Sequence, residues 1–175
     1  MAWNPRRPTG AGDVLAAVIS DTHLPRGSRR LPDACLDRLR CADLILHGGD
    51  LSRLPVLDEL RALGPPVYAV YGNADEIEVR ELLPERLVVE AGGARIGLVH
   101  IAGPRPGREG RLAADFSDCD AVVYGHTHLP QVARHRGIWI LNPGSPTERR
   151  RSPARSMLLV EIASNGTIRP ELVPL

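Results

Sequence analysis

The sequence contains no lysine, and all 22 of its basic residues are arginine. This absence excludes Schiff-base catalysis, anchoring of pyridoxal phosphate and the lysine of a P-loop. Against 21 acidic residues the arginines leave a formal net charge of +1. Dedicated nucleic-acid binders carry a strong basic excess, so we do not expect nucleic acid to be the partner.

Cysteine, aromatic residues and long apolar runs are also scarce. The three cysteines are odd in number and never spaced as CxxC, which argues against both a disulfide framework and a thiolate zinc site. With two Trp, three Tyr and one Phe, the core must be aliphatic. No apolar run approaches the length of a membrane span, and residues 1–12 lack the apolar region of a signal peptide. We therefore expect a cytoplasmic protein without membrane contact.

A chain of 175 residues with 43% apolar residues fits one domain. We assign residues 1–12 to a flexible tail and residues 13–175 to that domain. The first half alternates predicted strands (14–20, 43–47, 67–71) with predicted helices (33–39, 55–63). The second half reads as a hairpin (87–90 with 95–100), a helix (109–116) and further strands (120–124, 131–135, 138–141, 156–162, 167–173). Parallel and antiparallel patterns in one domain predict an α/β sandwich of two packed sheets with helices outside.

Polar side chains follow the ends of successive predicted strands: Asp21, His23, Asp50, Asn73, His100, His126 and His128. The carboxyl ends of strands in an open α/β sheet share one edge, so these side chains are expected to converge. They offer only nitrogen and oxygen donors, a set that suits Mn²⁺, Fe, Zn²⁺ or Co²⁺. Seven donors exceed one tetrahedral zinc site, and with one carboxylate shared they fill two adjacent metal sites with positions left for water and substrate.

Six motifs in order resemble the calcineurin-like metallophosphoesterases, most closely their small single-domain phosphodiesterase branch. They are Asp21-Thr22-His23, Gly48-Gly49-Asp50, Gly72-Asn73-Ala74-Asp75, His100, Gly125-His126-Thr127-His128 and Asn142-Pro143-Gly144-Ser145. The resemblance spans residues 14 to 162 and implies a four-layer αββα sandwich of two mixed β-sheets with flanking helices.

The same resemblance implies a binuclear centre. One divalent ion is expected on Asp21, His23 and His128, the other on Asn73, His100 and His126, with Asp50 bridging both. Mn²⁺ is the foremost candidate, and Fe, Zn, Co, Ni and Mg remain open. The implied reaction is hydrolysis of a small phosphoester, most of all a phosphodiester, by a hydroxide that bridges the metals, with Asp50, Asn73 and His100 as catalytic residues. Small members often form homodimers, which leaves that assembly open here.

This interpretation depends on the residue that follows Asn73 and on whether all seven donor positions hold competent side chains. Many relatives have a histidine after the asparagine that serves the leaving oxygen, whereas this chain has Ala74. A missing proton donor predicts weak activity on esters with poor leaving groups. The alternative is a non-catalytic, metal-binding scaffold or interaction protein of the same fold. Scaffolds of this kind have lost metal ligands, whereas all seven positions here hold competent side chains.

Neighbouring residues are expected to support the site without coordinating a metal. We predict that His47 holds the loop of Asp50, and that Asp75 is a helix cap or a hydrogen-bond acceptor. The loop 142–145 is expected to support the metal site from behind. The arginine run at 149–151, with Arg155, is interpreted as a solvated loop.

Overall fold

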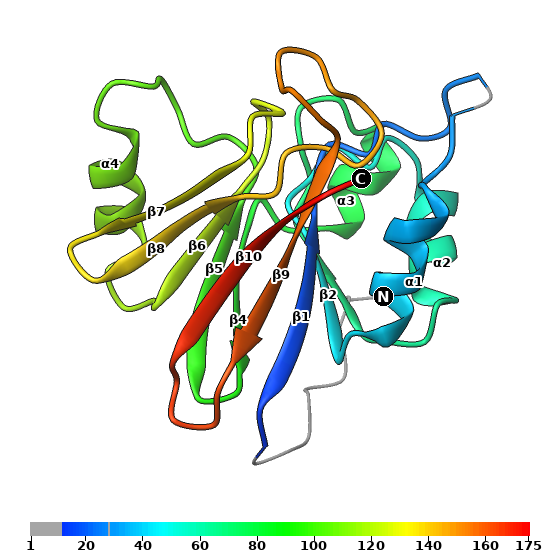
Figure 1. Ribbon diagram of the computed structural model, residues 1–175. Coiled ribbons are helices and arrows are strands. Elements are labelled where there is room, and N and C mark those ends of the chain that lie inside the picture. The colour runs from blue at the N-terminus through cyan, green and yellow to red at the C-terminus, as the bar shows by residue number, and fades with distance from the viewer. Residues whose placement is uncertain (1–11, 28) are drawn as a thin grey trace.

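The computed structural model describes residues 12–27 and 29–175, so the predicted tail lies, apart from Gly12, outside the described residues. The described residues form ten strands and four helices (Figure 1). The strands are β1 (Val14–Ile19), β2 (Leu44–His47), β3 (Val67–Ala69), β4 (Arg86–Ala91), β5 (Ala94–Val99), β6 (Ala121–Tyr124), β7 (Gln131–His135), β8 (Ile138–Asn142), β9 (Ser156–Ile162) and β10 (Ile168–Pro174). The helices are α1 (Asp33–Cys41), α2 (Leu54–Arg61), α3 (Ile77–Leu82) and α4 (Arg108–Asp115).

The strands make two five-stranded sheets, in the orders β10-β9-β1-β2-β3 and β4-β5-β6-β8-β7. In the first sheet β1, β2 and β3 run parallel, while β9 and β10 join antiparallel. In the second sheet β5, β6 and β8 run parallel, with antiparallel β4 and β7 at the edges. Both sheets are therefore mixed. Figure 1 shows α1 and α2 outside one sheet and α4 outside the other, so the predicted αββα sandwich is confirmed.

Alternation along the strands explains these layers, because successive side chains of a strand point to opposite faces. On β1, Ala16 and Val18 join the apolar core between the two sheets. Ala17 and Ile19 instead pack under the first three helices, against residues such as Leu39. A third cluster lies between α4 and the second sheet.

The sequence analysis missed α3 entirely. This helix has six residues, and only Val79 among them is buried. Its three apolar residues, Ile77, Val79 and Leu82, span less than two helical turns, which is too short for a helical periodicity to be detected. Every other predicted element is present, with ends that differ by a few residues at most. None of the helices in the described part of the chain has the length and apolar character needed to cross a membrane.

Candidate metal centre

The seven predicted site residues all follow the carboxyl ends of parallel strands. The register of the strands determines where each strand ends relative to its neighbour. At the carboxyl ends, Ile19 of β1 pairs with His47 of β2, and Val99 of β5 pairs with Tyr124 of β6. The segments after these strands therefore start level with one another. The segment after β1 then runs beside the one after β2, where the Asp21 N–H donates to the Gly49 carbonyl at 2.9 Å.

Five of the seven residues have a left-handed backbone, a conformation that non-glycine residues rarely adopt. Their φ angles lie between 47° and 69°, at Asp21, His23, Asp50, His126 and His128. Such backbone is unfavourable and persists where the surroundings enforce it, which is common at functional sites. Most of the residues that meet at the centre are therefore held in this conformation.

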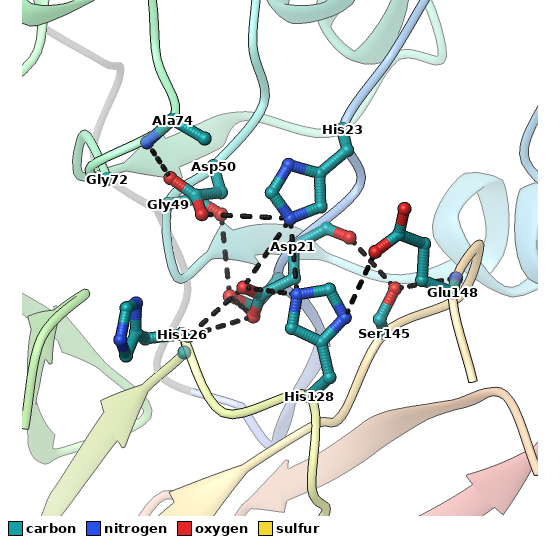
Figure 2. Close-up of polar contacts among 12 residues, drawn as sticks. Asp21, His23, Gly49, Asp50, Gly72, Ala74, His126, His128, Ser145 and Glu148 are labelled. Carbon is teal, nitrogen blue, oxygen red and sulfur yellow. Dashed lines mark hydrogen bonds and ion pairs between the residues drawn. The ribbon is translucent and has the colours of Figure 1, made fainter. Parts of the chain in front are cut away.

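The Asp21 carboxylate is fully buried at the middle of the centre. It accepts hydrogen bonds from the Ser20 hydroxyl at 2.8 Å and from the His126 N–H at 3.0 and 3.1 Å. The His126 bond joins the edges of the two sheets. Oδ1 of Asp21 also lies 3.2 Å from Nε2 of His128 and 3.9 Å from Nε2 of His23 (Figure 2).

The Asp50 carboxylate lies between His23, which follows a strand of the first sheet, and His100, which follows a strand of the second sheet. Its Oδ2 is 3.2 Å from Nε2 of His100 and 3.7 Å from Nε2 of His23. Its Oδ1 accepts the Ala74 N–H at 2.7 Å. Glycine at position 72 makes this placement possible, since a Cβ there would lie 2.1 Å from Oδ1 of Asp50. Asp50 is therefore fixed by backbone groups and faces both halves of the centre.

The donor atoms form two compact groups. Asp21, His23 and His128 make the first, and Asp21, Asp50 and His100 make the second, with all ligand atoms of a group within 4.8 Å of one another. Asp21 belongs to both. His23 and His128 stack at an interplanar angle of 13° and bring their Nε2 atoms to 3.2 Å.

Asn73 and His126 lie beside the second group and are bonded to each other. Nδ1 of His126 donates to Oδ1 of Asn73 at 2.7 Å. The ring of His126 stands edge-on to that of His100, with centroids 5.4 Å apart. Both residues are exposed, so they form the outer wall of the centre.

The geometry of His100 fits a cation. Its Nδ1 donates to the Gly48 carbonyl at 2.7 Å, so a neutral ring presents the lone pair of Nε2 to the centre. That buried Nε2 has no hydrogen-bond partner among the described residues and faces the Asp50 carboxylate. A lone pair and a carboxylate turned toward one point are what a divalent ion binds. The imidazole and carboxylate donors suit Mn²⁺, Fe or Zn²⁺.

Electrostatics keep the centre in this state. Burial raises the pKa of Asp50, but its contacts with His100 and the Ala74 N–H outweigh burial and hold the pKa at about 2. Burial lowers the pKa of His23 more than the charges of Asp50 and Asp21 raise it. Burial also lowers the pKa of His126, assisted by His100. Asp50 is therefore anionic beside the neutral imidazoles of His23 and His126, whereas the contact with Asp50 and the charges of Asp21 and Asp50 outweigh burial and raise the pKa of His100.

The predicted supporting residues are in contact with the centre. Nδ1 of His47 accepts the Gly49 N–H at 3.1 Å, which confirms that His47 holds the loop of Asp50. The Asp75 carboxylate accepts the N–H groups of Asp50, Ser52 and Gly72. Asp75 is thus an acceptor and not a helix cap, since α3 begins after Glu76 without a side-chain cap.

The loop 142–145 supports the centre as predicted. The Ser145 hydroxyl donates to the Asp21 carbonyl at 2.8 Å, and the Asn142 amide donates to the Gly125 carbonyl at 3.0 Å. The four arginines of the following run are exposed, although Arg150 pairs with Glu148 at 3.0 Å.

Sequence reasoning missed Glu148. Its side chain is 9% exposed, and its Oε2 lies 3.6 Å from Nδ1 of His128. The signal available was its position three residues after Ser145 of the Asn-Pro-Gly-Ser loop, but the adjoining arginines gave it the pattern of a solvated run.

Comparison with known proteins decides the family. The calcineurin-like phosphoesterase superfamily domain matches residues 14–165. The chain belongs to that superfamily. A probable metallophosphoesterase of Methanocaldococcus jannaschii is 36% identical over 167 residues, which cover 94% of this chain and 83% of the relative. The chain is therefore a metal-dependent phosphoesterase.

Solved structures place this phosphoesterase in the small single-domain branch. A single mutant of Vps29 from Entamoeba histolytica is 30% identical, covers 92% of this chain and 99% of its own, and superimposes with a TM-score of 0.72. Wild-type Vps29 of the same organism, solved in complex with Zn²⁺, is 29% identical over 91% of this chain and 98% of its own, with a TM-score of 0.67.

Proposed function

We propose that this phosphoesterase hydrolyses small phosphodiesters with two divalent metal ions, with Mn²⁺ as the foremost candidate. The observation that carries the proposal is the pair of buried donor groups that share the Asp21 carboxylate at the common edge of the two sheets. A single ion would leave one of these groups without a cation. Paired ions held by carboxylates and imidazoles are a common arrangement for in-line displacement at phosphorus.

In this proposal one ion is held by Asp21, His23 and His128, which form the first donor group, and the carboxylate that bridges to the second ion is Asp50, although Asp21 is the residue common to both groups. The position of Oδ2 of Asp50, 3.7 Å from Nε2 of His23 and 3.2 Å from Nε2 of His100, supports that shared role.

The second ion would take Asn73, His100 and His126. The lone pair that His100 turns toward Asp50 supports this assignment. Asn73 and His126 would supply the remaining oxygen and nitrogen donors from the exposed side of the centre, where a substrate can approach.

When bound, two ions supply Lewis-acid stabilisation of phosphoryl charge and lower the pKa of water. The chain's own contribution is to hold its donors in place before substrate arrives. The Ala74 N–H and Asp75 fix the loop of Asp50, while the Gly48 carbonyl fixes the tautomer of His100. Such preorganisation removes reorganisation from the chemical step.

The preference for diesters rests on position 74. Ala74 directs only its backbone N–H to the centre, where it binds Asp50, and has no side-chain donor for a departing oxygen. Alkyl monoesters need such protonation more than activated diesters do. We therefore propose turnover of activated diesters and weak turnover of alkyl monoesters.

A second candidate is a metal-binding scaffold, favoured by the likeness to Vps29, including the Zn²⁺ complex. The presence of all seven donor side chains supports the enzyme instead. The two candidates differ in one observable: the scaffold binds metal without hydrolysing any ester at saturating metal.

The test combines metal analysis with an activity panel. Metal content per chain is measured for the wild type, Asp50→Ala and His23→Ala, together with rates on a diester, a monoester and a cyclic nucleotide. We expect the wild type to bind two ions per chain. Asp50→Ala should lose metal from both sites, whereas His23→Ala should lose metal mainly from one site. Two ions retained in Asp50→Ala would refute the shared carboxylate, and a metal-loaded wild type inactive on the whole panel would favour the scaffold.

A further inference from the structure

His128 lies between two carboxylates on opposite sides of its ring. Its Nε2 faces Asp21 at 3.2 Å, within the centre, while its Nδ1 faces Oε2 of Glu148 at 3.6 Å, outside the centre (Figure 2). The buried Nδ1 has no hydrogen-bond partner among the described residues, and Glu148 is the acidic group beside it. A shift of about 0.4 Å would bring the two atoms within ordinary hydrogen-bond distance.

Glu148 is itself held by three arginines. Its Oε1 accepts hydrogen bonds from the guanidinium groups of Arg29 and Arg26, the one from Arg26 at 3.1 Å. Its Oε2 accepts a hydrogen bond from Nε of Arg150 at 3.0 Å. Its backbone N–H donates to the Ser145 hydroxyl at 2.9 Å. These contacts fix the carboxylate beside the ring.

We propose that Glu148 is a positioning residue that accepts the Nδ1–H of His128 and so commits Nε2 of that ring to the metal. The inference rests on the metal centre proposed above. A neutral imidazole carries one proton, so a proton drawn to Nδ1 leaves the lone pair on Nε2. A carboxylate behind a ligating histidine also fixes the ring plane and raises ligand basicity, and losing it typically costs 10- to 100-fold in metal affinity or activity.

A merely architectural role makes different predictions. If Glu148 only ties the loop after Ser145 to Arg26 and Arg29, its loss lowers stability but leaves the His128 tautomer and the metal affinity unchanged. Metal affinity and the ring's nitrogen resonances therefore separate the two roles, which activity alone does not.

The test uses the full chain as wild type, Glu148→Ala and Glu148→Gln, with Glu171→Ala as control. Glu171 is an exposed carboxylate on β10, and its removal changes the net charge by the same amount. Stepwise Co²⁺ titration of the metal-free proteins, followed by visible absorption, gives the affinity of each site. Long-range ¹H–¹⁵N spectra of the Zn²⁺-loaded proteins report which nitrogen of His128 carries the proton.

In Glu148→Ala we expect one site to weaken by about 10- to 100-fold, with the other unchanged, and the Nδ1–H resonance of His128 to shift or vanish. Glu148→Gln keeps the volume and an acceptor oxygen, so its loss of metal affinity should be smaller than that of Glu148→Ala. If Glu148→Ala does not fold, the comparison of Glu148→Gln with the wild type provides the test. The Glu171→Ala control should match the wild type.

A wild type that binds two ions while Glu148→Ala and Glu148→Gln bind them equally well, with unchanged His128 resonances, would overturn this inference and leave the proposed function intact. A wild type that binds no metal would overturn both.

Discussion

The fully buried His47 links the centre to acid stability. Nδ1 of His47 accepts the Gly49 N–H, and its Nε2 lies 3.1 Å from the Thr22 hydroxyl. Burial lowers the pKa of His47 from 6.5 to about 3, against the charges of Asp21 and Asp50, which raise it. Below pH 6.5 the unfolded chain therefore binds a proton that the folded chain refuses. The folded state consequently loses stability as the pH falls from 6.5 toward 3.

The size of this loss follows from the two pKa values. One pH unit corresponds to about 1.36 kcal/mol, so lowering the pH from 7.5 to 5.0 removes about 2 kcal/mol through His47 alone. His47→Asn is the matched perturbation, because the amide oxygen can still accept the Gly49 N–H but does not titrate. Denaturant unfolding at pH 7.5 and pH 5.0, with chelator present in all samples, gives the four free energies of unfolding.

We expect the wild type to lose about 2 kcal/mol more than His47→Asn between these pH values. The comparison is a difference of differences, so any fixed cost of the substitution cancels. Equal losses in the two proteins would show that the fold does not hold His47 neutral.

Three further substitutions test other parts of the account. In Gly72→Ala the new Cβ would lie 2.1 Å from Oδ1 of Asp50. Displacing that carboxylate by about 1 Å should reduce turnover by about 10²-fold. The control Gly12→Ala, at a position where nothing lies within 4 Å of the new Cβ, should match the wild type. Ala74→His should weaken the dependence of rate on leaving-group pKa across a series of aryl phosphodiesters; identical slopes at full metal content would exclude a leaving-group role for position 74. Ser145→Ala removes a hydroxyl that accepts two backbone N–H groups and should cost about 1–3 kcal/mol of unfolding free energy; a cost near zero by denaturant unfolding would contradict that role.

The fold and the location of the site could be predicted because both depend on periodic signals. Short aliphatic runs indicated the strands, and a polar residue at the end of each run marked the edge where ligands bind. Asp21, Asp50 and His100 illustrate this: each follows a buried strand, and their side chains meet in the structure. The family resemblance added the expected division into two metal sites.

What could not be predicted depends on contacts between segments distant in sequence. The shared position of Asp21 arises because the His126 N–H, 105 residues away, binds its carboxylate. The environment of Glu148 arises in the same way, from Arg26 and Arg29 on the loop after β1. The left-handed backbone at five site residues could not be predicted either, because Asp and His adopt it more often than most residues but still uncommonly, and the surrounding contacts decide where it persists.

The most direct test of metal-dependent diester hydrolysis is the rate on an activated aryl phosphodiester before and after removal of metal. The protein is dialysed exhaustively against chelator, its metal content is confirmed, and Mn²⁺ is then added back in steps. We predict that turnover disappears with the bound metal and returns as the second ion per chain is restored. Undiminished turnover by protein shown to contain no metal would contradict the account.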